Sequence, residues 1–213
     1  MNTIDFIFEK NQLDDTGERP VRIPNVNRLF LTGWLQELGF KVGVEVGVAQ
    51  GKYLRSLCFA NPNMFFYGVD AEVMYPGYTD IVNQRDLDYL KKTLLSVMAP
   101  YPNHKMIRKF SMDAVKDFED NSIDFVYIDA NHNDPYVTQD IEEWTKKVRP
   151  GGIVSGHDYI TKELDGLHWD YDVVAAVDKY VKNHNLTLFL LGLDEKYPGI
   201  VRESIRSWMF VKE

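Results

Sequence analysis

The sequence predicts an α/β protein with a doubly wound, mostly parallel sheet of seven strands and an antiparallel strand at one edge. Its clearest stretch, SIDFVYIDANHNDPYVTQDIEEWTKKVRPGGIVSGHDY, predicts a strand at Ile123–Asp129, a helix at about 135–148, a Pro-Gly-Gly turn and a strand at Ile153–Gly156. Strands that alternate with helices at this spacing are typical of βαβ units. The last two predicted strands, NLTLFLLGL and SIRSWMFVK, have no strong helix between them, which indicates the antiparallel addition.

Shorter patterns predict the remaining elements. Apolar residues at helical spacing predict a helix that Asn25 caps and Gly39 ends. Apolar runs rich in β-branched or aromatic residues predict strands in KVGVEVG, MFFYGVD and KMIRKF, and helices are expected in GKYLRSLCFA, near residues 83–98 and in DVVAAVDKYVKNH, with a short helix or turn in AVKDF. Residues 1–25 are polar and irregular and are expected to form an arm or lid, which leaves 26–213 as a single domain.

Length and composition limit the class of protein. A chain of 213 residues can bury a full core within one domain. Cys58 is the only cysteine, and the acidic N-terminal flank does not resemble a secretory signal, so a reducing, cytoplasmic location is expected. Without a run of about 18 apolar residues, no membrane span is expected. The net charge of −8 argues against nucleic acid as a partner, and the sequence leaves open whether the chain forms a homo-oligomer.

Four predicted strands end in, or just before, a carboxylate: Glu45, Asp70, Asp129 and Asp158. The carboxyl ends of parallel strands meet at one edge of a sheet, and ligands of open α/β sheets bind outside that edge. We therefore expect these four acidic residues around one crevice. The alternative for each of them is a helix cap or a solvated loop residue, roles that aspartate often has.

The loop after the first of these strands has the pattern E-x-G-x-x-x-G, from Glu45 to Gly51. Gly47 would allow a tight turn, and Gly51 would let a ligand approach the next helix closely. The dinucleotide fingerprint G-x-G-x-x-G does not fit this spacing. An acidic residue so close to a helix start would also repel a pyrophosphate, so the loop favours a cationic or zwitterionic ligand.

Together, these residues resemble the class I S-adenosylmethionine-dependent methyltransferases. The stretch from Asp124 to Tyr159 is similar to a small-molecule methyltransferase group with the motifs D-F-x-x-I-D-x-x-H, Y-x-x-V-x-x-D, P-G-G and, after strand five, H-D-Y. The resemblance covers about residues 40–212. It implies a Rossmann-like methyltransferase fold, S-adenosylmethionine as cofactor and methyl transfer to a small-molecule substrate, with a hydroxyl oxygen of a sugar or other metabolite as the expected acceptor.

The resemblance also implies roles for individual residues. Gly47 and Gly51 would shape the loop beside the methionine part of the cofactor, with Glu45 near its amino group, and Asp70 would accept hydrogen bonds from the ribose hydroxyls. Contacts to the adenine are expected after the third strand, and a further cofactor contact at the end of the fourth; the residues at these positions are Ser111, Met112, Asp113 and Asp129. For Met112 a place in the core, and for Asp113 a helix cap, are the alternatives.

A hydroxyl acceptor must lose a proton, and histidine is the usual base near neutral pH. The expected catalytic residues are His132, His157 and Asp129, with loop-bonding structural roles as the alternative for the two histidines. The loop at 161–172, which carries His168 and Trp169, follows the fifth strand, where members of the group bind acceptors, and it is a candidate lid.

A divalent metal is a further expectation from the resemblance, because some small-molecule O-methyltransferases hold one at the ends of strands four and five. The matching positions are Asp129, His157 and Asp158. Magnesium prefers oxygen ligands only, whereas zinc or manganese would accept the imidazole. In the alternative without a metal, which we favour, His157 is the base and Asp158 orients it.

Two other classes of function compete with an enzyme of this kind. One is a non-catalytic domain that binds an adenosyl cofactor and acts as a sensor or partner subunit. The other is a nicotinamide-dependent oxidoreductase, which the missing G-x-G-x-x-G disfavours.

Overall fold

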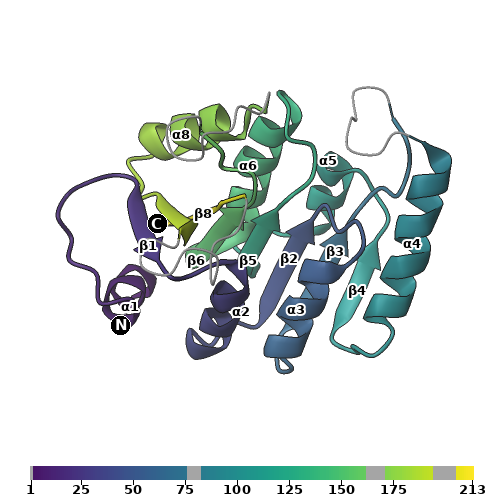
Figure 1. Cartoon of the computed structure of the whole chain (residues 1–213), viewed down its shortest axis with the longest axis horizontal. Coiled ribbons are helices and arrows are strands. Elements are labelled where there is room, and N and C mark those ends of the chain that lie inside the picture. The colour runs from purple at the N-terminus through teal and green to yellow at the C-terminus, as the bar shows by residue number, and fades with distance from the viewer. Residues whose placement is uncertain (1, 76–82, 162–170, 194–204) are drawn as a thin grey trace.

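The computed structural model describes residues 2–75, 83–161, 171–193 and 205–213, and its centre is one sheet of eight strands (Figure 1). The strands lie in the order β1-β7-β8-β6-β5-β2-β3-β4. Their bounds are β1 (Val21–Pro24), β2 (Val42–Val46), β3 (Phe65–Val69), β4 (His104–Ile107), β5 (Ile123–Ile128), β6 (Val148–Gly156), β7 (Phe189–Leu193) and β8 (Ser207–Val211).

The predicted fold class is confirmed: the sheet is mostly parallel and helices cover both of its faces. Strand β8 is antiparallel to both of its neighbours, β6 and β7, and lies near one edge of the sheet. The sheet has eight strands rather than seven because β1 pairs in parallel with β7 and becomes the outermost strand.

Two layers of helices enclose the sheet. One face carries α1 (Thr3–Lys10), α2 (Arg28–Glu37), α3 (Lys52–Ala60) and α4 (Gln84–Met98), and the other carries α5 (Ser111–Ala114), the 3₁₀ helix η1 (Val115–Asp117), α6 (Tyr136–Lys147) and α8 (Val173–Asn183). Side chains alternate between the two cores along each strand: in β5, Phe125 faces the first helical layer and Val126 faces the second. None of the helices in the described ranges combines the length and apolar character that a membrane crossing requires.

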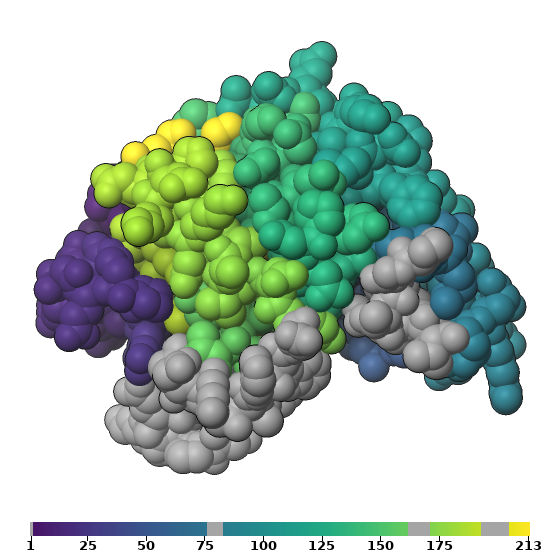
Figure 2. All heavy atoms as spheres, turned by 90° about the horizontal axis from the view of Figure 1, so that it is seen from above, coloured from purple at the N-terminus to yellow at the C-terminus, as the bar shows by residue number. Residues whose placement is uncertain are grey.

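The N-terminal segment differs most from expectation. Residues 3–10 and 21–24 are not irregular, because they form α1 and β1. Ile7 and Ile23 are fully buried in the same core as α2 and α3, and the ring of Phe8 packs against that of Phe189 at 5.8 Å. The space-filling view shows this segment, in purple, against the C-terminal half of the chain, in yellow-green (Figure 2).

Local capping explains where α2 begins. The side chain of Asn27, not that of Asn25, accepts hydrogen bonds from the backbone N–H groups of Leu29 and Phe30 at 2.9 and 3.3 Å. This cap fixes Arg28 as the first residue of the helix, at the same edge of the sheet as the end of β5. The helix ends at Glu37, close to the predicted stop at Gly39.

One carboxylate ties three strands together at the opposite, amino edge of the sheet. One oxygen of Asp124, in β5, accepts hydrogen bonds from the backbone N–H groups of Lys41 and Val42 at 2.7 and 2.9 Å, where β2 begins. Its other oxygen accepts a hydrogen bond from Nε of Arg149, in β6, at 2.6 Å. Because these bonds are charge-assisted and the side chain of Asp124 is only 13% exposed, they should contribute clearly to stability.

We therefore expect Asp124→Ala to lower the free energy of unfolding by about 2–4 kcal/mol, because two backbone donors and a guanidinium lose their acceptor. Urea denaturation measures the change. The matched control is Asp117→Ala, which breaks an exposed pair with Lys109 and should cost less than about 1 kcal/mol. Equal losses in the two variants would contradict a special role for Asp124.

Candidate active site

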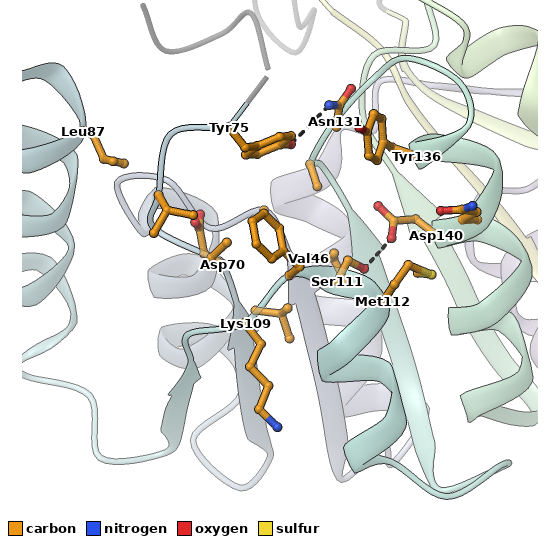
Figure 3. A pocket seen from close by; sticks show the side chains of 17 residues that line it. Val46, Asp70, Tyr75, Leu87, Lys109, Ser111, Met112, Asn131, Tyr136 and Asp140 are labelled. Atoms are coloured by element: carbon orange, nitrogen blue, oxygen red, sulfur yellow. Dashed lines mark hydrogen bonds between the residues drawn. The ribbon is translucent and has the colours of Figure 1, made fainter. Parts of the chain in front are cut away.

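The order of the strands reverses between β2 and β5, which places a crevice at the carboxyl ends of these two strands. A cavity of about 600 Å³ lies there (Figure 3). Its walls come from the ends of β2 and β3, the segment from Lys109 to Met112, and the start of α6. The polar side chains that line it belong to Asp70, Tyr75, Lys109, Ser111, Asn131, Tyr136, Gln139 and Asp140.

The glycine loop fits against the end of β5. Gly47 has a φ of +88°, and an added Cβ would overlap the backbone carbonyl oxygen of Asp129. Gly51 has a φ of +75°, and a Cβ there would lie 2.6 Å from a methyl carbon of Leu94. Both positions therefore require glycine, and Gly47 also lines the cavity.

Asp70 follows β3 and lines the cavity, but its carboxylate already holds the glycine loop. One of its oxygens accepts hydrogen bonds from the backbone N–H groups of Val48 and Ala49 at 3.1 and 3.0 Å. The other accepts one from the N–H group of Glu72 at 2.8 Å. Each carboxylate oxygen has more than one lone pair, so this arrangement leaves capacity for a ligand hydroxyl.

Glu45 is not among the residues that line the cavity. It lies in register with Tyr127 of β5, whose side chain is in the core beneath α2 and α3, and its own side chain is 2% exposed. One carboxyl oxygen has no hydrogen-bond partner. Burial, and next the charge of Asp129, raise the pKa of Glu45 well above its ordinary value, so a neutral carboxyl is favoured there.

The three residues expected at the adenine separate into two groups. Ser111 and Met112 line the cavity, whereas Asp113 does not. The carboxylate of Asp113 points to solvent, where it pairs with Lys116 at 2.9 Å. Asp113 is thus corrected from a cofactor contact to a surface residue in the first turn of α5.

Beside the cavity lies a cluster of two aspartates and one histidine: Asp129, His132 and Asp158. Nε2 of His132 is 3.0 Å from a carboxylate oxygen of Asp158 and 3.5 Å from one of Asp129. Ala130 and Asn131, which separate Asp129 from His132, line the cavity. The structure therefore brings together three of the predicted residues around one point.

His157 lies at the rim of this cluster. Its Nδ1 is 3.2 Å from the same oxygen of Asp158, and its backbone carbonyl accepts a hydrogen bond from the indole of Trp208 at 3.0 Å. The one set of three potential metal ligands found within the described residues is Asp129, His132 and Asp158, whose ligand atoms lie within 4.8 Å of one another. In this candidate set the histidine is His132 and not the expected His157.

Asp158 is held in one orientation and kept ionised. Its φ of +62° is unusual for a residue with a side chain, and the side chain is nearly fully buried. Burial by itself would raise the pKa of Asp158, but the hydrogen bonds from His132 and His157 and their charges outweigh it and hold the pKa well below its ordinary value. The carboxylate can therefore orient an imidazole and stabilise its protonated form.

The sequence assigned no role to Arg28 or Asp140, and it placed Tyr75 only among the loop aromatic residues that could wall an acceptor pocket. The guanidinium of Arg28 lies 3.5 Å from Oδ2 of Asp129, the oxygen that does not face His132, and 5.4 Å from the centre of the Tyr53 ring. Tyr75 accepts a hydrogen bond from the amide of Asn131 at 3.2 Å and so reaches across the cavity, as Figure 3 shows. Asp140 also lines the cavity.

Residues 162–170 of the candidate lid lie outside the described residues. Tyr159 of the H-D-Y motif is buried in the core.

A family model for a methyltransferase domain matches residues 44–159, which is more than half of the chain. The chain belongs to this family of methyltransferase domains. The O-methyltransferase TomG from Streptomyces achromogenes, solved in complex with S-adenosylmethionine, has a similar structure, with a TM-score of 0.61 and 12% identity over 98% of this chain and 87% of that one. An O-methyltransferase from Bacillus cereus, in complex with S-adenosylhomocysteine, gives a TM-score of 0.59 and 13% identity over 99% and 90%.

At these identities the two structures establish a shared fold. Among curated proteins, one of Sinorhizobium fredii with the name Uncharacterized protein y4gI is 33% identical over 67 residues, which is 32% of this chain. The match covers only 7% of the length of that relative.

The contact between Gly47 and Asp129 generates a prediction. We expect Gly47→Ala to lower the free energy of unfolding by more than about 2 kcal/mol, because a Cβ overlaps a backbone carbonyl and the φ is unfavourable. The control is Gly33→Ala in the middle of α2, where a Cβ meets no atom within 4 Å; this change should stabilise the protein by about 0.5–1 kcal/mol. Unchanged stability of Gly47→Ala in urea denaturation would contradict the described packing.

Proposed function

We propose that the protein transfers a methyl group from S-adenosylmethionine to a hydroxyl oxygen of a small molecule. The observation that carries this proposal is the position of the His132 imidazole, 3.0 Å from an ionised, buried Asp158, beside a cavity at the switch point of a methyltransferase fold. A buried carboxylate next to an imidazole is the arrangement that general-base catalysis requires. Hydroxyl acceptors need such a base.

The cavity fits the adenosyl half of the cofactor by its chemistry. Asp70 lies at one side as an acceptor for ribose hydroxyls, while Met112, Phe110 and Tyr136 offer apolar surface to a purine. Gly47 lines the cavity at the end of β2, where the loop presents backbone rather than a side chain to the methionine half of the cofactor. Glu45, buried on the other side of the sheet, would act on the cofactor only through other groups, in keeping with an indirect role.

When bound, S-adenosylmethionine supplies a methyl group on a sulfonium, which is a good leaving group. The task of the chain is then to position the acceptor and to remove its proton. Nε2 of His132 carries the hydrogen that it donates to the ionised Asp158, so the proton of the acceptor would pass to Nδ1, and Asp158 would stabilise the imidazolium that results. Asp129, paired with Arg28, adds a second negative charge 3.5 Å from Nε2 of the same ring.

A divalent metal is the second candidate, which the compact donor set Asp129, His132 and Asp158 favours. Two carboxylates and one imidazole suit zinc or manganese better than magnesium. A metal held there would use Nε2 of His132, so that this residue would position the ion rather than act as the base. Chelation of the metal should therefore abolish methyl transfer in the metal mechanism and leave it unchanged in the mechanism without a metal.

Calorimetric titration with S-adenosylmethionine and S-adenosylhomocysteine tests the function. We expect micromolar binding of both, with the same affinity in EDTA as with added zinc, manganese or magnesium. Loss of methyl transfer in EDTA, and its recovery with one metal, would favour the metal mechanism. No binding of either compound would refute the methyltransferase proposal.

We expect His132→Ala to lower methyl transfer by about 10²–10⁴-fold, because the reaction loses its base, while the affinity for S-adenosylhomocysteine changes less than threefold. Transfer of a labelled methyl group to a panel of monosaccharides and phenols measures the rate. His184→Ala, at the exposed end of α8, is the control and should leave both quantities unchanged. A parallel loss of affinity and rate in His132→Ala would indicate structural damage instead of a missing base.

A further inference from the structure

We propose that Asp140 recognises the exocyclic amino group of the adenine and thereby sets the nucleobase specificity of the cofactor site. This inference rests on the proposed function and goes beyond it, because it assigns to a residue of α6 an adenine contact, whereas the sequence analysis expected such contacts at Ser111, Met112 and Asp113. It depends on three observations: which hydrogen bonds Asp140 makes, where its second oxygen points, and what the rest of the cavity offers.

The hydrogen-bond chain fixes the role of each oxygen. The indole Nε1 of Trp144 can only donate, and it donates to Oγ of Ser111 at 2.8 Å. The single hydroxyl hydrogen of Ser111 is therefore directed to Oδ1 of Asp140, which accepts it. A proton on the Asp140 carboxyl can then reside only on the other oxygen, Oδ2.

Oδ2 faces the cavity. Figure 3 shows Asp140 with one oxygen on the dashed bond to Ser111 and the other directed into the space between Tyr136 and Ser111, across from Asp70. None of the described residues donates a hydrogen bond to Oδ2, although the side chain as a whole is only 3% exposed. Because Asp140 lines the cavity, a ligand that enters can replace the solvent at Oδ2 with a hydrogen-bond donor of its own.

The remaining lining leaves adenine recognition to Asp140. Asp70 is the other carboxylate among the described lining residues, and the proposed function assigns its remaining acceptor capacity to the ribose hydroxyls. Lys109 lines the cavity with its stem, but its ammonium group is paired with Asp117 at 2.6 Å. The adenine amino group is an N–H donor, and the ionised Oδ2 of Asp140 is a stronger acceptor for it than the neutral amide of Gln139, which also lines the cavity.

The same geometry couples binding to pH. Burial raises the pKa of Asp140 to about 7, although the bond from Ser111 lowers it in part. The other titratable groups at the cavity are Asp70, Lys109, Tyr75 and Tyr136, and the described parts of β5, β6 and α8 add no charged residue to its lining. Because the amino group binds the ionised carboxylate, a proton on Oδ2 competes with the cofactor, and the affinity falls as the pH drops below about 7.

The test uses calorimetry at about pH 8 with S-adenosylhomocysteine and with its 6-oxo analogue, S-inosylhomocysteine. We expect the unmodified protein to prefer the adenine compound by at least about tenfold, because a 6-oxo group would face Oδ2 with a second acceptor. In Asp140→Asn the amide offers hydrogens to the cavity, so the preference should fall below about threefold or reverse. Glu143→Gln, an exposed change on the same helix, should keep the full preference.

Titration of the unmodified protein at several pH values is the second measurement. We expect its affinity for S-adenosylhomocysteine to rise about tenfold from about pH 6 to about pH 8 and that of Asp140→Asn to change much less. A preference that is unchanged in Asp140→Asn, or an affinity that falls with rising pH, would overturn the proposal. If Asp140→Asn fails to fold, base preference and pH dependence in the unmodified protein still decide. No binding of S-adenosylhomocysteine at any pH would instead refute the proposed function.

Discussion

The close contact between the glycine loop and the end of β5 is the constraint on which the site depends. The backbone at Gly47 approaches the carbonyl of Asp129 so closely that no side chain fits, and the N–H group of Asp129 donates to the carbonyl of Val46 at 2.8 Å. This contact joins one wall of the cavity to the segment that carries His132. Because β2 and β5 are adjacent parallel strands, the register of the sheet itself places the cavity beside the cluster of Asp129, His132 and Asp158.

A site of this kind must also keep several carboxyl groups close together, and the chain does so in three ways. Asp129 has the guanidinium of Arg28 at 3.5 Å. Asp158 receives hydrogen bonds from two imidazoles, which keep it ionised despite its burial. Glu45 has neither kind of partner for one of its oxygens, and its raised pKa favours the neutral form. One sheet edge thus combines an ion pair, a hydrogen-bonded carboxylate and a buried acid whose pKa is raised.

The fold and the strand-end acids could be predicted because their signals are local: a run of β-branched residues and a carboxylate at its end need no knowledge of distant partners. The segments α1 and β1 were missed because Ile7 and Ile23 become buried only against residues far along the chain. Which histidine lies beside both Asp129 and Asp158 could not be predicted, since adjacency of His157 to Asp158 in sequence does not tell which imidazole faces Asp129. The hydrogen bond to Asp140 likewise comes from Ser111, a residue of another helix.

Strand β1 also has a consequence for solubility. It covers β7, whose sequence FLLGL contains neither charge nor proline and would otherwise offer an apolar, unpaired strand to any neighbouring chain. The covering strand is a poor template for further pairing: it is four residues long, exposes Arg22, and ends in Pro24, which has no N–H to donate. The N-terminal segment therefore protects the sheet against edge-to-edge aggregation, a role unrelated to the chemistry at the carboxyl ends of the central strands.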